Sequence, residues 1–100
     1  MKTSTDTLKA LLAYVEKTRA EVVEDDTLPR KERLLVIERL MSALTTDEVK
    51  AARLRDVDGL SVQLDQHFED LHWRWQEIDQ GRPVKRLPRG HLREMLGGLR

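Results

Sequence analysis

The distribution of glycine and proline constrains this fold more than any other sequence feature. The 100-residue chain has only five glycines and three prolines, and four of those glycines and two of those prolines lie beyond residue 80. The first 80 residues therefore contain few residues that interrupt a helix. They also lack the alternating apolar and polar runs that predict strands. We expect an all-α protein, built as a small bundle of three to four helices.

Apolar residues at helical spacing predict three helices, at about residues 6–24, 29–44 and 46–79. The apolar stripe of the first helix includes Val22, and residues 4–6 offer side-chain oxygens to cap its start. The second helix is apolar over much of its circumference, so we expect it to be the most buried element and the centre of the core.

The third predicted helix is unusually long. It begins with a capping box, in which the side chains of Thr45 and Glu48 satisfy free backbone amides. Residues 46–79 would span about 50 Å, against about 24 Å for the helix at 29–44. One short helix cannot cover an apolar stripe twice its length. Either the chain bends or breaks at Gly59 to give two helices of one bundle, or the surplus stripe pairs with a second copy of the chain.

Charge divides the chain at Gly81. Residues 1–81 carry 12 lysines and arginines against 17 acids, a net charge of −5, and residues 82–100 carry six basic residues against one acid, a net charge of +5. We therefore expect an acidic helical bundle domain over 1–81 and a basic C-terminal arm over 82–100. Pro83 and Pro88 favour an extended start to the arm, and a short amphipathic helix is predicted to end it.

Composition excludes several classes of protein. Cysteine is absent, which excludes disulfides and thiolate metal sites and fits a reducing cytoplasm. Uninterrupted apolar runs such as residues 34–37 are far too short to cross a membrane. The chain has no glycine-rich phosphate loop and no serine with a plausible histidine and aspartate. We expect a soluble cytoplasmic protein with no enzymatic activity, no cofactor and no membrane partner.

One pair of residues has the spacing of a metal site. Glu69 and His72 match the i, i+3 pair used in di-iron carboxylate bundles, but such sites need a second pair of this kind. The other histidines, His67 and His91, do not follow a glutamate at that spacing. We therefore expect a surface ion pair and no metal site.

Trp73 is the first candidate for contact with a partner. It lies about 160° around the helical wheel from Val57 on the core stripe, whereas Trp75 lies on that stripe. Val62 shares the outer face, and polar residues such as Arg74 surround the indole. An aromatic side chain among polar groups is typical of an interaction hot spot. The alternative is that a neighbouring helix or the returning arm covers Trp73 within the monomer.

The basic arm offers two further sets of candidate binding residues. The cations are Arg82, Lys85, Arg86 and Arg89, and the apolar anchors are Leu92, Met95 and Leu96. The cations would steer the arm toward an acidic surface, and the anchors have the spacing of a groove-binding amphipathic helix. Two alternatives stay open for the arm. It could bind the phosphates of a nucleic acid, or fold back onto the acids between Asp65 and Asp79 of its own chain.

These features predict a small non-enzymatic regulatory protein that acts by protein–protein binding, as an adaptor, an antagonist or inhibitor, or a chaperone-like protein. The expected partner is another protein with an acidic surface, and a homodimer stays open. The competing hypothesis is a nucleic-acid-binding accessory protein that uses the basic arm. The arm has no aromatic residues for stacking on single strands, and the chain has no zinc site or helix-turn-helix glycine turn. We therefore favour a protein partner.

Overall fold

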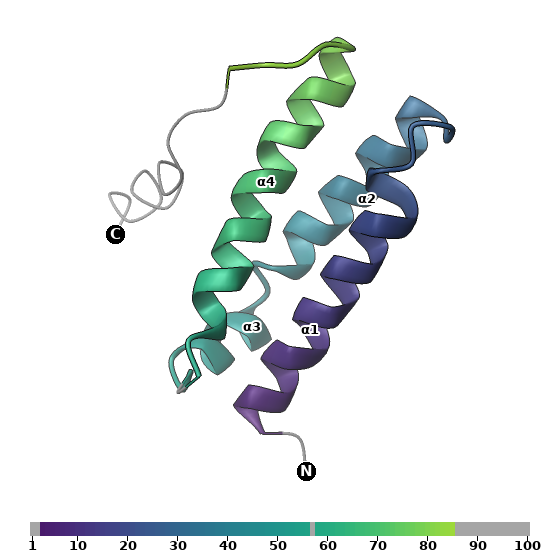
Figure 1. Ribbon diagram of the computed structural model, residues 1–100. Helices are drawn as coiled ribbons and strands as arrows, with labels where there is room; N and C mark the ends of the chain where they lie inside the picture. Colours follow the sequence, from purple (N-terminus) through teal and green to yellow (C-terminus); the bar gives the residue numbers. More distant parts are fainter. Residues whose placement is uncertain (1–2, 57, 86–100) are drawn as a thin grey trace.

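The computed structural model of the protein describes residues 3–56 and 58–85 (Figure 1). Over these ranges the chain forms α1 (Ser4–Thr18), the π-helical turn η1 (Arg19–Val23), α2 (Arg30–Ala43), α3 (Asp47–Arg53) and α4 (Leu60–Gln80). No strand occurs in either range, so the predicted all-α bundle is confirmed. No helix in these ranges is long and apolar enough to cross a membrane.

The helices share one core. α1, α2 and α4 lie side by side, and the short α3 lies at the end of the bundle where α1 and α4 begin (Figure 1). α4 packs against both α1 and α2, and α3 packs against α1. The buried apolar side chains are those of Leu8, Val15, Val23, Ile37, Leu40, Leu44, Val49, Ala52, Leu60, Leu64, Leu71 and Ile78. Every helix supplies at least one of them, so a single core holds the described part of the chain together.

α1 begins with a capping box at Thr3. The Thr3 hydroxyl accepts a hydrogen bond from the backbone N–H of Asp6 (3.0 Å), and the Thr3 N–H donates to the Asp6 carboxylate (3.3 Å). The cap predicted within residues 4–6 is therefore wrong by one position. Thr3 is the cap because a capping box needs a carboxylate three residues after the cap. Among residues 3–6, only Thr3 has an acid at that spacing.

The π-helical turn η1 moves the core face of the first helix by one residue. The Glu24 N–H donates to the Arg19 carbonyl, five residues earlier, at 2.9 Å. This wider turn inserts an extra residue, so the apolar period of seven becomes eight between Val15 and Val23. Val23 is fully buried, whereas Val22 is only half-buried. The prediction that Val22 continues the core stripe is therefore wrong.

α2 buries one face and exposes the other. Ile37 and Leu40 are fully buried, but Leu35 is 46% exposed. The expectation that this helix is the most buried element is wrong, because α4 contributes more buried side chains and contacts both other long helices. Leu35 meets solvent, as single apolar residues on a protein surface often do, whereas Val36, also outside the main face, packs against the core.

Of the two arrangements expected for residues 46–79, the structure has the one with two helices of one bundle. α3 ends at Arg53, and α4 begins at Leu60 directly after Gly59, whose φ of 73° is left-handed. The Asp56 carboxylate accepts hydrogen bonds from the N–H groups of Leu60 (3.0 Å) and Ser61 (2.8 Å). These bonds, with Ser61 contributing most, hold the pKa of the Asp56 carboxyl below its usual value. Asp56 therefore supplies the cap that Gly59 cannot, since glycine has no side chain.

The cap of α3 also differs from the prediction by one residue. The Thr46 hydroxyl accepts from the Val49 N–H at 3.3 Å. The Thr45 hydroxyl instead donates to the carbonyls of Met41 (3.3 Å) and Ser42 (3.1 Å) at the end of α2. Thr45 therefore satisfies carbonyl groups at the end of the preceding helix, and the next threonine caps α3.

Candidate protein-binding surface

α4 has a core-facing side and an outward side. Leu64 and Leu71 are 1% and 0% exposed, and they mark the side that faces the core. At 100° per residue, Val62 and Trp73 lie about 160° and about 180° around the axis from Leu64. They are three turns apart, about 16 Å along the helix. The outward face of α4 comprises Val62, Gln66, Glu69 and Trp73.

The two tryptophans of α4 have different environments. Trp75 packs against the core from a partly buried position. Trp73 is half-buried but is not among the described side chains that form the core or pack against it. The ring of His72 meets the Trp73 indole edge-on, with the ring centroids 4.8 Å apart and the planes at 79°. The structure therefore places Trp73 on the outward side, with a histidine beside it.

Exposure changes along the outward face. Val62 is 46% exposed and Gln66 is exposed, but Glu69 is only 6% exposed and Trp73 is half-buried. The face is therefore open near the start of α4 and shielded around Glu69 and Trp73.

Arg74 points toward α1 and away from the predicted binding surface. Its Nε atom lies 3.4 Å from Glu24 Oε2, and the other carboxylate oxygen of Glu24, Oε1, lies 3.6 Å from Arg19 Nη2. The Arg74 side chain is 26% exposed. Its charge is thus engaged in an ion-pair cluster that joins α4 to the end of the first helix, and it contributes less to an outer binding surface than the sequence pattern predicts.

Arg19 and His67 form the centre of that cluster. Arg19 Nη1 donates to His67 Nδ1 at 2.8 Å and lies 3.6 Å from the Asp70 carboxylate. A guanidinium only donates, so Nδ1 must accept and the neutral ring carries its proton on Nε2, 3.8 Å from Glu16. Burial, together with the positive charge of Arg19, lowers the pKa of His67, although Glu16 and Asp70 oppose this. The imidazole is therefore a neutral acceptor at neutral pH.

His72 is bonded within its own helix. Its Nε2 atom lies 3.0 Å from Gln76 Nε2, and because an amide nitrogen only donates, the histidine nitrogen accepts. Burial lowers the pKa of His72. Glu69, the other member of the predicted surface pair, is buried. No group of three metal-ligating side chains occurs among the residues that the structure describes.

The structure describes only the first part of the basic arm. Gly81 has a left-handed φ of 71°, and the N–H groups of Gly81 and Arg82 both donate to the Glu77 carbonyl, at 2.9 and 3.2 Å. This arrangement ends α4. Arg82 and Lys85 follow it and are exposed. The remaining predicted binding residues, Arg86, Arg89, Leu92, Met95 and Leu96, and the predicted short helix lie outside the described residues.

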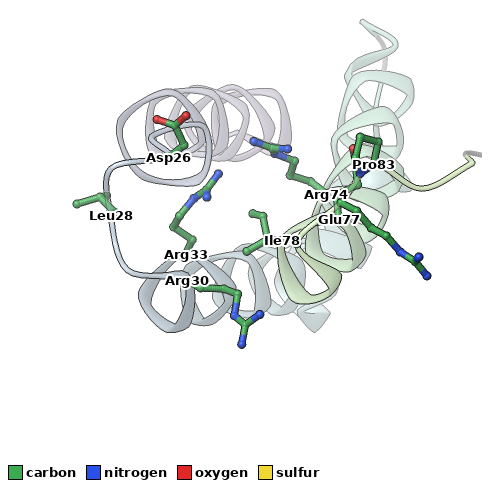
Figure 2. Close-up of a pocket in the computed structure, with 10 residues that line it drawn as sticks. Asp26, Leu28, Arg30, Arg33, Arg74, Glu77, Ile78 and Pro83 are labelled. Atoms are coloured by element: carbon green, nitrogen blue, oxygen red, sulfur yellow. The ribbon is translucent and has the colours of Figure 1, made fainter.

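Sequence reasoning missed an open pocket of about 530 Å³ at the end of the bundle where α4 ends (Figure 2). Arg33 reaches into it from α2 and Arg74 from α4, while Arg30 points away. Arg33 is 8% exposed, and its Nε and Nη2 atoms donate to the Val23 carbonyl at 3.0 and 2.6 Å. Arg30 donates to the Asp79 carbonyl at 3.1 Å. Both arginines therefore satisfy carbonyl groups at helix ends, a role that apolar spacing does not reveal.

No protein-family model, curated protein or solved structure matches this chain.

Proposed function

We propose that this protein is a small regulatory protein that works by binding another protein, as an adaptor, an antagonist or a chaperone-like protein, without catalysing a reaction. Its binding surface is the outward face of α4, where Trp73 and Val62 supply the apolar contacts. The arm that begins at Arg82 supplies positive charge. The absence of cysteine fits a site of action in the reducing cytoplasm.

The position of Trp73 carries this proposal. Large aromatic side chains stabilise small domains chiefly by burial in the core, as Trp75 does here. Trp73 instead lies outside the core, on a face whose other apolar residue, Val62, is 46% exposed. Tryptophan is enriched among residues that dominate binding energy at protein interfaces. A partner that covers Trp73 and Val62 would account for both side chains.

Charge supports a partner with an acidic surface. The arm carries a net charge of +5, and its described residues Arg82 and Lys85 are exposed. Charges at the rim of an interface raise the rate of association more than they raise affinity. The arm would therefore speed the encounter, and the outward face of α4 would hold the complex.

Affinity capture from the native cytoplasm tests this proposal. The baits are the full chain and its Trp73→Ala and Leu35→Ala variants, each used with and without nuclease. Leu35 is a matched control because it is an exposed apolar residue of a different helix, α2, and is 46% exposed. We expect the unchanged chain and Leu35→Ala to retain the same protein, with or without nuclease, and Trp73→Ala to lose it. Circular dichroism of all three baits shows that each is folded.

The opposite pattern would support the nucleic-acid hypothesis. Capture that survives Trp73→Ala but disappears with nuclease would mean that the arm binds phosphates. Affinity would then fall linearly with the logarithm of salt concentration, and replacing one phosphate-contacting cation such as Arg82 would reduce the slope by about one. That outcome would overturn the protein-binding proposal.

A further inference from the structure

The outward face of α4 is less exposed around Glu69 and Trp73 than at its start. Glu69 lies about 140° around α4 from Leu64, yet it is 6% exposed, and Trp73 on the same side is half-buried. α1 and α2, which pack against α4, lie on its other side (Figure 1). A glutamate so far from the core is normally solvated. This part of the outward face is therefore shielded although it lies far from the core-facing side.

The chain leaves α4 toward its outward side. The left-handed conformation of Gly81 ends the helix, with two N–H groups bonded to the Glu77 carbonyl. Residues 82–85 then run away from α1 and α2 (Figure 1). The described part of the arm therefore leaves α4 on the side away from α1 and α2.

The acids of α4 make the shielded end complementary to a basic amphipathic segment. Glu69 and Glu77 lie four residues before and four residues after Trp73, so an indole stands between two acids on adjoining turns. Of the charged residues of α4, five are acidic and one is basic: Asp65, Glu69, Asp70, Glu77 and Asp79, against Arg74. A segment with cations beside apolar side chains would be complementary in charge and in polarity to this surface.

The remaining segment has that composition and sufficient reach. Residues 86–100 carry four arginines and one acid, together with the apolar residues Leu87, Leu92, Met95, Leu96 and Leu99. Fifteen residues extend to about 50 Å, or to about 22 Å as a helix. The distance from Gly81 back to Glu69 is about 18 Å along α4. The segment can therefore return as far as Glu69 in either conformation.

We propose that segment 86–100 docks on the C-terminal end of the outward face of α4 in its own chain, with arginine side chains against Glu69 and Glu77 and apolar side chains against Trp73. The docked arm leaves Val62 free and covers the indole. The regulatory part of this inference rests on the proposed function. A protein partner that binds Trp73 must first displace the arm, so the free protein is self-inhibited.

A spin label on the arm tests the docking without any partner. The chain has no cysteine, so His91→Cys gives a single labelling site in the full chain without changing an arginine or an acid of the arm. The measurement is the paramagnetic broadening of the Trp73 indole N–H signal in ¹⁵N-labelled protein. The comparison is the same labelled chain with Arg86→Glu and Arg89→Glu. We expect strong broadening in the first chain and its loss in the second.

Two controls separate docking from other causes. The chemical shift of the buried Trp75 indole N–H shows that the bundle is intact in each variant. Glu69→Gln, which removes the acid and keeps the shape of the side chain, should also reduce the broadening of Trp73. Combining an arm that carries Arg86→Glu with Glu69→Lys should restore part of it, since the charges are then exchanged.

Two outcomes would overturn the inference. Equal broadening with and without the arm substitutions would mean that the arm moves as a free tether. Broadening of a ¹⁵N-labelled chain by a spin label on a separate unlabelled chain would mean that a second copy occupies the face. Neither outcome depends on a partner, so failure of the docking is distinguishable from failure of the proposed function, which the capture experiment tests on its own.

The regulatory consequence has a separate readout. If the arm covers Trp73, the Arg86→Glu and Arg89→Glu substitutions should uncover the indole, so that its N–H exchanges with solvent faster than in the unchanged chain. Protection of the Trp73 indole N–H from solvent exchange that is identical with and without the arm substitutions would contradict self-inhibition.

Discussion

Two arginines attach helix ends to neighbouring helices through main-chain carbonyl groups. Arg33 binds the Val23 carbonyl at the end of η1 through two N–H groups, and Arg30 binds the Asp79 carbonyl near the end of α4 through one. The last carbonyl groups of a helix have no partner within it. A buried guanidinium with two parallel donors is well suited to such a group, and a lysine ammonium is not.

Arg33→Lys should therefore destabilise the protein. The substitution removes one of two charge-assisted hydrogen bonds in a site that is 8% exposed, and we expect a loss of about 1.5 kcal/mol in the free energy of unfolding. Urea denaturation measures it. Arg30→Lys is the matched control and should change stability by less than about 0.5 kcal/mol, because Arg30 is exposed. Equal effects of the two substitutions would contradict the role assigned to Arg33.

The protonation state of His67 links stability to pH. Burial and the charge of Arg19 lower the pKa of His67 from its ordinary 6.5, so the folded protein binds this proton less readily than the unfolded chain. The stability that the neutral His67 ring contributes is complete above pH 6.5, the ordinary pKa. It is lost as the pH falls through the lowered pKa of the folded protein. Protonation also removes the acceptor of the 2.8 Å bond from Arg19.

We expect the free energy of unfolding to decrease as the pH is lowered from about 7.5 to about 5, starting near the ordinary histidine pKa of about 6.5. His67→Gln should reduce this dependence, and the part that remains belongs to His72, whose pKa is also lowered by burial. Denaturation at several pH values, with NMR titration of both rings, measures it. A protein that becomes more stable over this range on acidification would refute the assignment.

At the scale of whole elements, the π-helical turn η1 decides which valine enters the core. An uninterrupted α-helix after Val15 would bury Val22, whereas the wider turn buries Val23. The ion-pair cluster around Arg19 begins in the same turn and joins it to α4. The turn thus fixes both an apolar and a charged contact of the first helix.

Paired alanine substitutions test this register. Val23→Ala should lower the free energy of unfolding by about 2 kcal/mol, because it empties a fully buried site. Val22→Ala should cost less than about 1 kcal/mol, since that side chain is half-buried. Thermal or urea denaturation of the two variants gives the comparison. A larger cost at Val22 would indicate an uninterrupted α-helix.

Gly59 gives a test whose sign depends on the architecture. In the structure its φ is 73° and nothing lies within 4 Å of an added Cβ, so alanine would meet backbone strain alone. Gly59→Ala should then lower stability by about 1 kcal/mol, and Gly59→Asn by less. In one continuous helix the alanine would instead raise stability by about 1 kcal/mol. Urea denaturation of both variants distinguishes the two arrangements.

The sequence predicts the elements well and their junctions poorly. Helical spacing and the scarcity of glycine and proline are properties of long stretches, so the all-α class follows from them. The caps at Thr3 and Thr46 and the register at Val23 each differ from expectation by one residue, because they depend on which of several neighbouring groups finds a partner. The wheel position of Trp73 was predictable, but the engagement of Arg74 with Glu24 required the packing of two helices.

For the molecule as a whole, the division of charge is the feature that links fold to function. An acidic bundle with a net charge of −5 precedes an arm with a net charge of +5, and α4 presents Trp73 between Glu69 and Glu77. Opposite charges joined in one chain favour contact between the two parts and are weakened by salt. Under the proposed function, the arm and a partner protein compete for the outward face of α4.

The most direct test of the account is the affinity of the captured partner for the Trp73→Ala and Leu35→Ala variants, measured by titration calorimetry. We predict that Trp73→Ala raises the dissociation constant about 30-fold, the equivalent of about 2 kcal/mol, while Leu35→Ala changes it by less than about twofold. An unchanged dissociation constant for Trp73→Ala, in a variant that remains folded, would contradict the claim that the outward face of α4 is the binding surface.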